Sequence, residues 1–122
     1  MSCRIDKQQI TMTRGDTRKM FFYRKDKLGH IITYKANKIY FTVKESEFDE
    51  TPIFQKTIAD MVFGEDYSYT FTITPEDTNG LEYGDYVYDI EVITDTGAKR
   101  TISKGNFKLT WESTWAQNEG DN

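Results

Sequence analysis

The chain of 122 residues has a single cysteine, a single histidine and little proline, and each of these shortages excludes a class of protein. Cys3 has no second cysteine with which to form an intramolecular disulfide, so the Cys–Trp–Cys pattern of antibody domains is absent. This fits folding in a reducing compartment. His30 has no second histidine or cysteine cluster to complete a catalytic dyad or a zinc site, and we predict that it is an exposed turn residue.

Long apolar runs are also missing. Every apolar stretch is short and interrupted by charge, whereas a membrane-spanning helix needs about 20 apolar residues. Residues 1–9 are polar and lack the apolar stretch of a secretory signal. The formal net charge of -4 provides no electrostatic basis for holding a phosphate backbone. We therefore expect no membrane insertion, no signal peptide and no nucleic-acid partner.

The sequence motifs of enzyme chemistry are absent as well. The sequence contains no Gly-rich phosphate loop, no nucleophile elbow and no dinucleotide fingerprint. Carboxylate neighbours such as Asp85 and Asp89 arise freely on an acidic surface, so they do not by themselves indicate a glycosidase. The turn at 94–97 supplies one carboxylate, whereas a calcium site needs about six oxygens or more. We therefore expect no enzymatic activity, no cofactor and no metal.

Aromatic side chains, in contrast, are abundant: they make up 15% of the chain, while only 37% of it is hydrophobic. They recur in runs with a period of two, which is typical of strands with one buried face. The alternation is cleanest over 38–44, where Ile39, Phe41 and Val43 share a face. Similar alternation predicts strands over 67–73 and 85–93.

Weaker patterns predict the remaining strands, over 8–13, 17–24, 30–34, 53–58 and 102–111. Pro52 points to an edge strand at 53–58, and Gly105 suggests a bulge in the last strand. Thr74 followed by Pro75 resembles a helix start, with Asp77 at the third helical position.

These elements predict an all-β fold, an immunoglobulin-like antiparallel β-sandwich of about seven to eight strands with one short helical turn near 75–79. The sandwich is expected to occupy 1–115 as one domain. Residues 116–122 lack apolar periodicity and are expected to form a flexible C-terminal tail.

Four aromatic residues are singled out. Residues 81–90 resemble the corner of immunoglobulin-like domains at which a tyrosine ties the penultimate strand to the preceding loop, and Tyr86 is the candidate for that role. Trp111 belongs to the last apolar row of the final strand, and Trp115 follows that strand next to a polar tail. Because indole and phenol rings concentrate in protein interfaces, Tyr83, Trp111 and Trp115 are the candidate partner-binding residues. For Trp115, a ring folded back over the end of the sandwich is an equal alternative.

Three segments carry a resemblance to a known family: 10–17 (ITMTRGDT), 74–90 with its TPEDT and GDYVYDI motifs, and 101–107 (TISKGNF). In this order and spacing they resemble the N-terminal domain of phage baseplate upper proteins, which occur in tailed phages and prophages of Gram-positive bacteria. The similarity spans roughly residues 8–114.

The resemblance implies a structural, non-enzymatic role. The domain would dock on other tail or baseplate proteins of a phage or prophage, with a homo-oligomer as one form of the assembly. Its location would be the virion tail, or the bacterial cytoplasm during expression and assembly. The chain is expected to be either a free-standing tail accessory subunit or a piece of a longer protein.

Two alternatives come from other functional classes. In a carbohydrate-binding module, Tyr40, Tyr83 or Trp115 would stack on sugar rings in a shallow groove. In a cell-surface adhesion module, the tripeptide Arg14-Gly15-Asp16 would project into solvent. Turn chemistry alone accounts for that tripeptide, with a buried or paired Arg and Asp fixing the connection between strands.

Overall fold

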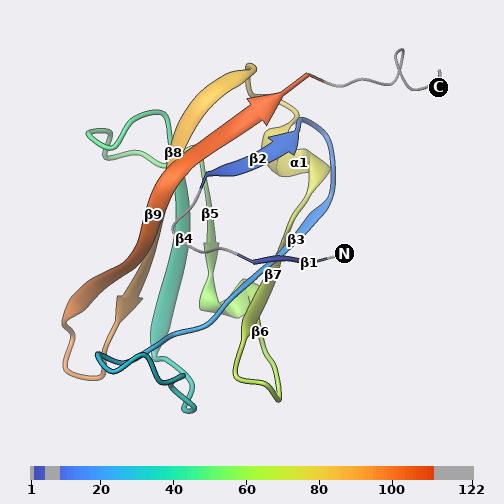
Figure 1. The fold of residues 1–122 in the computed structure, drawn as a ribbon. Helices are drawn as coiled ribbons and strands as arrows, with labels where there is room; N and C mark the ends of the chain where they lie inside the picture. The colour runs from blue at the N-terminus through green and yellow to red at the C-terminus, as the bar shows by residue number, and fades with distance from the viewer. Residues whose placement is uncertain (1, 5–8, 112–122) are drawn as a thin grey trace.

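In the computed structural model, which describes residues 2–4 and 9–111, the chain folds into two β-sheets packed face to face (Figure 1). Within those residues, the four-stranded sheet has the order β1-β3-β7-β6 and the five-stranded sheet the order β2-β9-β8-β4-β5. The first sheet comprises β1 (Ser2–Arg4), β3 (Arg18–Phe22), β7 (Tyr69–Ile73) and β6 (Val62–Phe63). The second comprises β2 (Ile10–Thr13), β9 (Lys99–Thr110), β8 (Gly84–Ile93), β4 (Lys38–Lys44) and β5 (Phe54–Thr57).

This arrangement confirms the predicted all-β sandwich. In immunoglobulin domains, strands A, B, E and D form one sheet and strands C, F and G the other. The first sheet here has the same order with β1, β3, β7 and β6, and the second has β4, β8 and β9, extended at its edges by β5 and β2. Most neighbours are antiparallel, but β1 runs parallel to β3 and β2 runs parallel to β9. Parallel pairing is thus confined to the two N-terminal strands of a sandwich that is otherwise antiparallel, as predicted. No hairpin joins these strands to their partners, so no turn determines their direction.

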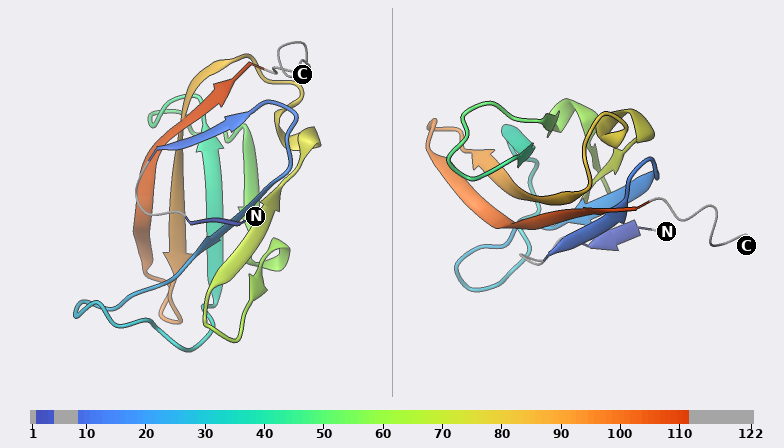
Figure 2. Two further views of the ribbon diagram at one scale, coloured as in Figure 1. Left: turned by 45° about the vertical axis from the view of Figure 1, so that its right-hand side comes forward. Right: turned by 90° about the horizontal axis from the view of Figure 1, so that it is seen from above.

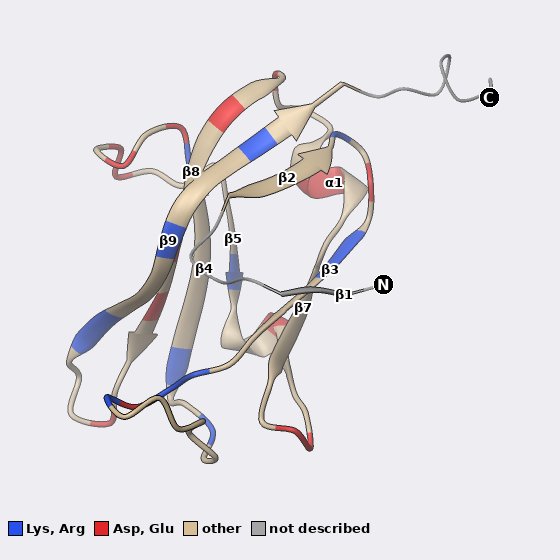
Figure 3. Cartoon of the chain, viewed as in Figure 1, with Lys and Arg blue, Asp and Glu red and all other residues tan. Residues whose placement is uncertain are grey.

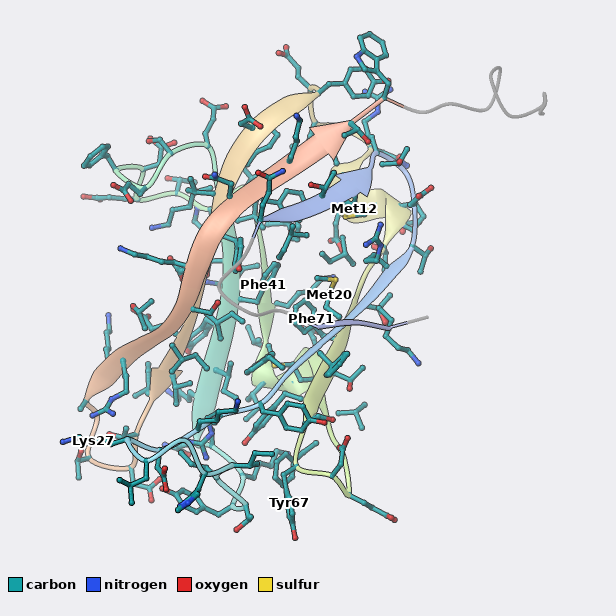
Figure 4. The ribbon with its side chains drawn as sticks, in the orientation of Figure 1. Met12, Met20, Lys27, Phe41, Tyr67 and Phe71 are labelled. Carbon is teal, nitrogen blue, oxygen red and sulfur yellow. The ribbon has the colours of Figure 1, made fainter. Side chains whose placement is uncertain are left out.

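The core lies between the sheets, where the buried side chains of β3 and β7 meet those of β2, β4, β8 and β9 (Figure 4). Ile39, Phe41 and Val43 of β4 are fully buried, as the alternation predicted. Phe41 packs across the sandwich on Phe71 of β7, with ring centroids 4.7 Å apart, and along its own sheet against Tyr88 of β8 at 5.8 Å. A small domain thus compensates for few apolar residues with large ones, because each aromatic ring buries a large area.

The predicted helical turn is α1 (Pro75–Thr78), which joins β7 to β8. Its start has the predicted chemistry: the Asp77 carboxylate accepts hydrogen bonds from the Thr74 backbone N–H at 2.9 Å and from the Thr74 hydroxyl at 3.1 Å. Lys56 of β5 forms a 2.7 Å ion pair with the same carboxylate. The turn is therefore held against the edge strand of the five-stranded sheet.

Three local predictions were wrong. Residues 30–34 form no strand: they meet residues 24–26 in an isolated bridge between Lys25 and Ile31 and in two backbone hydrogen bonds, from Asp26 to the His30 carbonyl and from Ile32 to the Arg24 carbonyl. Between the strands expected at 53–58 and 67–73, where no element was predicted, the chain forms the 3-10 turn η1 (Ile58–Asp60) and the short strand β6, which pairs with β7. The bulge in β9 lies at Ile102, where the register against β8 shifts, and not at Gly105, which pairs with Tyr88. The bulge lies there because it lets the Ile102 side chain pack against the core.

Candidate functional site

The loop between α1 and β8 is tied down by the predicted tyrosine corner. The Tyr86 ring is buried, and its hydroxyl donates a 2.6 Å hydrogen bond to the backbone carbonyl of Glu82. Burial raises the pKa of the Tyr86 hydroxyl, and the nearby charges of Glu45 and Glu82 act in the same direction. The hydroxyl therefore stays protonated and remains a donor, which holds residues 82–86 in place at one end of the sandwich.

An aromatic pair of the half-buried Tyr83 and the exposed Trp111 lies directly beside this corner. Tyr83 stacks on Trp111, with ring centroids 4.0 Å apart and planes tilted by 32°. The guanidinium carbon of Arg14 lies 4.5 Å from the centroid of the Tyr83 ring, and Nη1 of Arg14 donates to the Leu81 carbonyl at 3.2 Å. Arg14, Tyr83 and Trp111 are called the end surface below. Trp111 remains 70% exposed on it, a large fraction for an indole ring.

The end surface lines an open hollow of about 640 Å³. These residues belong to the end of the sandwich at which β9 finishes, and Figure 2 shows where that strand ends. The remaining lining residues of the hollow come from the tyrosine corner and from the last three residues of β9: Glu82, Gly84, Lys108, Leu109 and Thr110. Aromatic surface at the centre with Arg, Lys and Glu at the margin is the composition of a protein-binding patch, since such patches combine an apolar core with a polar rim.

The structure brings Tyr83 and Trp111 together but does not bury Trp111 as the last core row of β9. Leu109 is the final buried residue of that strand, and Thr110 pairs with Thr13, the last residue of β2. Trp111 therefore lies just beyond the last residue pair of β2 and β9, and it is exposed there. Trp115 and the expected tail at 116–122 lie outside the described residues, as does the predicted domain end at 115.

The Arg14-Gly15-Asp16 turn contributes to the end surface in a way that sequence reasoning missed. Gly15 has φ of 86°, a left-handed conformation that favours glycine, and its N–H donates to the Thr78 hydroxyl at 2.9 Å. Arg14 is paired, as turn chemistry suggested, whereas Asp16 is exposed. Because the guanidinium is held by Leu81 and Tyr83, the tripeptide does not project freely as an adhesion motif would require. The sequence signal that could have indicated this contribution was an arginine directly before a glycine that forms a turn.

His30 and Asp89, two titratable residues that the sequence analysis weighed for catalysis, lie apart from the end surface: His30 is in the loop between β3 and β4, and Asp89 is in the middle of β8. His30 is 75% exposed in a loop, as predicted, with Nδ1 3.8 Å from the Asp26 carboxylate. Burial raises the pKa of Asp89, an effect opposed by Lys44 and Lys104. Among residues 2–4 and 9–111, no group of three His, Cys, Asp or Glu side chains is placed to hold a metal ion. The helices in the same part of the chain are too short and too polar to span a bilayer.

No family model matches the chain, and no curated protein is significantly similar to it. Among solved structures, the chain is similar to CopC from Methylosinus trichosporium OB3b, with 10% sequence identity over 85% of each chain and a TM-score of 0.42. Similarity at this level carries no argument about function, so the candidate function rests on the chain's own surface.

Proposed function

We propose that this domain is a non-enzymatic protein-binding module of a phage or prophage tail or baseplate, and that it docks on a partner protein through Arg14, Tyr83 and Trp111. The observation that carries the proposal is that Trp111 is exposed while its ring packs on neighbouring side chains that hold it in place. The indole is 70% exposed and packs on Tyr83, which in turn packs on Arg14. Trp, Tyr and Arg are the residue types that most often dominate binding energy in protein interfaces.

The surface is also pre-organised, which favours binding. Arg14 is fixed by the Leu81 carbonyl, and the loop that carries Tyr83 is held by the Tyr86 hydrogen bond. A partner would therefore pay little to order these side chains on docking. The charges of Lys108 and Glu82 at the margin would set orientation and specificity more than affinity.

The phage setting comes from the resemblance of three sequence segments to baseplate upper proteins. These segments are neighbours in the fold: β2 pairs with β9, β9 pairs with β8, and the Gly15 turn bonds to Thr78 of α1. They also supply or flank the end surface. This proximity supports reading the resembling segments as one unit, and the chain would then reside in the virion tail or in the bacterial cytoplasm during assembly.

A carbohydrate-binding module is the second candidate, because an exposed Trp beside a Tyr can stack on a sugar ring. Tyr40 lies half-buried on β4, and Trp115 lies outside the described residues, so Trp111 and Tyr83 would have to form the platform. Their rings pack on each other and not side by side, which leaves Trp111 as the main free face. A single platform favours the protein partner over the sugar.

The test has two parts. Particles released from the organism that encodes the chain are purified and analysed by mass spectrometry, where the chain is expected at a fixed ratio to tail proteins. Purified chain carrying an affinity tag is then mixed with disrupted tails, as wild type, as Trp111→Ala and as Phe48→Ala. Phe48 is the matched control, since it is exposed elsewhere on the molecule.

Capture of one tail protein by the wild type and by Phe48→Ala, with at least tenfold loss in Trp111→Ala, is the expected result. Absence of the chain from particles would overturn the tail assignment. Binding to a glycan array that depends on Trp111, without capture of any tail protein, would replace the proposal with the carbohydrate alternative.

A further inference from the structure

Positive charge gathers at the opposite end of the sandwich, although the whole chain is acidic (Figure 3). The cationic residues come from the irregular segment between β3 and β4 with the first residue of β4, and from the β8–β9 connection with the first two residues of β9: Arg24, Lys25, Lys27, Lys35, Lys38, Lys99 and Arg100. The same two segments contain only Asp26 and Asp95 as acidic residues. We call this region the basic end. A concentration of one charge sign in a chain of opposite net charge points to an anionic ligand.

The basic end contains a hollow of about 270 Å³. Four of its lining residues are Arg24, Lys25, Lys27 and Arg100, and the apolar part includes Tyr34 and Ile102. A second hollow of about 170 Å³ shares Arg24 and Tyr34 with it. The volume of the first is sufficient for one or two carboxylate side chains together with their stems.

Asp26, the one acidic residue of the hollow, is engaged by its own loop. Its carboxylate accepts hydrogen bonds from the backbone N–H groups of His30 and Leu28, each at 2.9 Å. The hydrogen bond from His30 is the main reason that the pKa of Asp26 lies below its ordinary value. The carboxylate thus stabilises the loop, and among the described residues it forms no ion pair with the lysine and arginine side chains of the hollow.

Arg24 provides an independent indication of a missing ligand. It is only 7% exposed, its Nη2 donates to the Tyr34 carbonyl at 2.7 Å, and its guanidinium carbon lies 5.1 Å from the Tyr34 ring centroid. Its Nε is buried and has no hydrogen-bond acceptor among the described residues. A buried guanidinium normally has its donors satisfied, and a carboxylate is the group that matches it best. Tyr34, which covers it, is 68% exposed and so has room to move.

The sequence of this chain contains a segment of matching charge. Residues 112–122 carry Glu112, Glu119 and Asp121 and no lysine or arginine. We propose that the basic end binds the acidic segment 112–122 of a second copy of this chain, with Glu119 or Asp121 placed against Arg24, Lys27 and Arg100.

A second copy fits better than the chain's own segment. Trp111 and Arg100 lie toward opposite ends of β9, about 36 Å apart at the usual rise per residue of a strand. The ten residues after Trp111 span about 33 Å when fully extended, so only Asp121 could approach the hollow of the same molecule. A contact between one end of a copy and the other end of the next is heterologous, and it builds rings or filaments.

This inference goes beyond the proposed function, since it concerns a different surface and a different partner. The test is a fluorescence anisotropy titration of a labelled synthetic peptide of residues 112–122 with the whole protein, at low and at high salt. The protein is compared with the double variant Lys27→Glu/Arg100→Glu, and with Lys19→Glu as control. All three positions are exposed, so folding is expected to survive, and a circular dichroism melt checks it.

The peptide is expected to bind the wild type and the Lys19→Glu control equally, within twofold. The double variant should bind at least tenfold more weakly, and so should 0.5 M salt, because exposed charge pairs are screened. A peptide with Glu119→Gln and Asp121→Asn should lose binding to a similar degree.

Three results would overturn the inference: no binding of the acidic peptide, equal weakening by Lys19→Glu, or binding that persists in the double variant. Binding of inorganic phosphate without binding of the peptide would also overturn it, and would assign the hollow to small anions. Because Trp111 is unchanged throughout, failure here leaves the proposed docking of the end surface intact, and the reverse holds as well.

Discussion

Lys56 and Asp77 form a 2.7 Å ion pair that joins the edge strand β5 to the short helix α1, with both side chains largely buried. The pair connects elements about twenty residues apart in the chain, across the end of the sandwich. Burial by itself raises the pKa of the Asp77 carboxyl, but hydrogen bonds from Lys56 and from Thr74 outweigh it, and the pKa lies below its ordinary value. The carboxylate therefore favours the folded state as long as it is ionised.

A pH dependence follows for Asp77→Asn. A carboxyl with a lowered folded pKa contributes stability above its unfolded pKa, near 3.8, and loses it as pH falls through the folded pKa. At pH 7 the variant should be less stable by about 1–2 kcal/mol. Urea unfolding at pH 7 and pH 2.5 should show this gap closing at the lower pH. An unchanged difference in stability between wild type and variant at the two pH values would mean that ionisation of Asp77 does not stabilise the folded state.

Tyr86→Phe removes the hydroxyl that donates to the Glu82 carbonyl and keeps the ring. The expected cost is about 1 kcal/mol, because a carbonyl loses its partner at the end of the sandwich. Chemical denaturation measures it, with Tyr34→Phe as control on an exposed ring. Equal stability of Tyr86→Phe and wild type would show that ring burial alone holds the corner.

Thr78→Val tests the connection between the Gly15 turn and α1. Thr78 is fully buried, and its hydroxyl accepts the Gly15 N–H at 2.9 Å. An isosteric apolar side chain leaves that N–H without its acceptor, so a loss of about 1–3 kcal/mol is expected. Thr17→Val, at an exposed position in the same connection, should change stability by less than about 0.5 kcal/mol. Similar effects of the two substitutions would argue against a role for the hydrogen bond.

Phe41→Ala probes the contact between the sheets. Phe41 is fully buried and lies against Phe71 and Tyr88, so truncation should cost about 3–5 kcal/mol. The thermal midpoint and the urea midpoint should both fall strongly. Phe48→Ala, at an exposed ring, should leave both nearly unchanged. A small effect at Phe41 would mean that the core repacks around the missing ring.

Trp111→Ala separates binding from stability. Since the indole is mostly exposed and contacts Tyr83 alone among the aromatic rings of the described residues, its removal should change the free energy of unfolding by less than about 1 kcal/mol. Differential scanning calorimetry checks this directly. A large loss of stability would instead make Trp111 a structural cover for the end of the sandwich, and the capture experiment would then need Tyr83→Phe and Arg14→Lys in its place.

Several elements could be predicted from local pattern alone. In β4, β7 and β8 every second residue is buried, and a half-buried strand records this burial as a period of two. The start of α1 was predictable because Thr, Pro and Asp occupy the positions that satisfy free N–H groups at a helix start. The Tyr86 corner was suggested by a resemblance, and its hydrogen bond lies within four residues of the chain.

Other features could not be obtained this way. Residues 30–34 have strand-like composition, but their pairing with 24–26 stops at one bridge and two backbone hydrogen bonds. Trp111 has the correct parity for the core, but it lies beyond the last pair of β2 and β9. Periodicity states which face of a strand is apolar, and it contains no information on whether a facing layer exists.

The sequence by itself determined the strands with two unlike faces, the capped turn at Thr74 and the aromatic character of the core, because each depends on residues close together in the chain. Only the tertiary structure decided the parallel placement of β1 and β2, the stacking of Tyr83 on Trp111 over Arg14, and the hollow around Arg24. Those features join segments that are far apart in the chain. Their contacts depend on how the two sheets pack and end, which local patterns of polarity do not record.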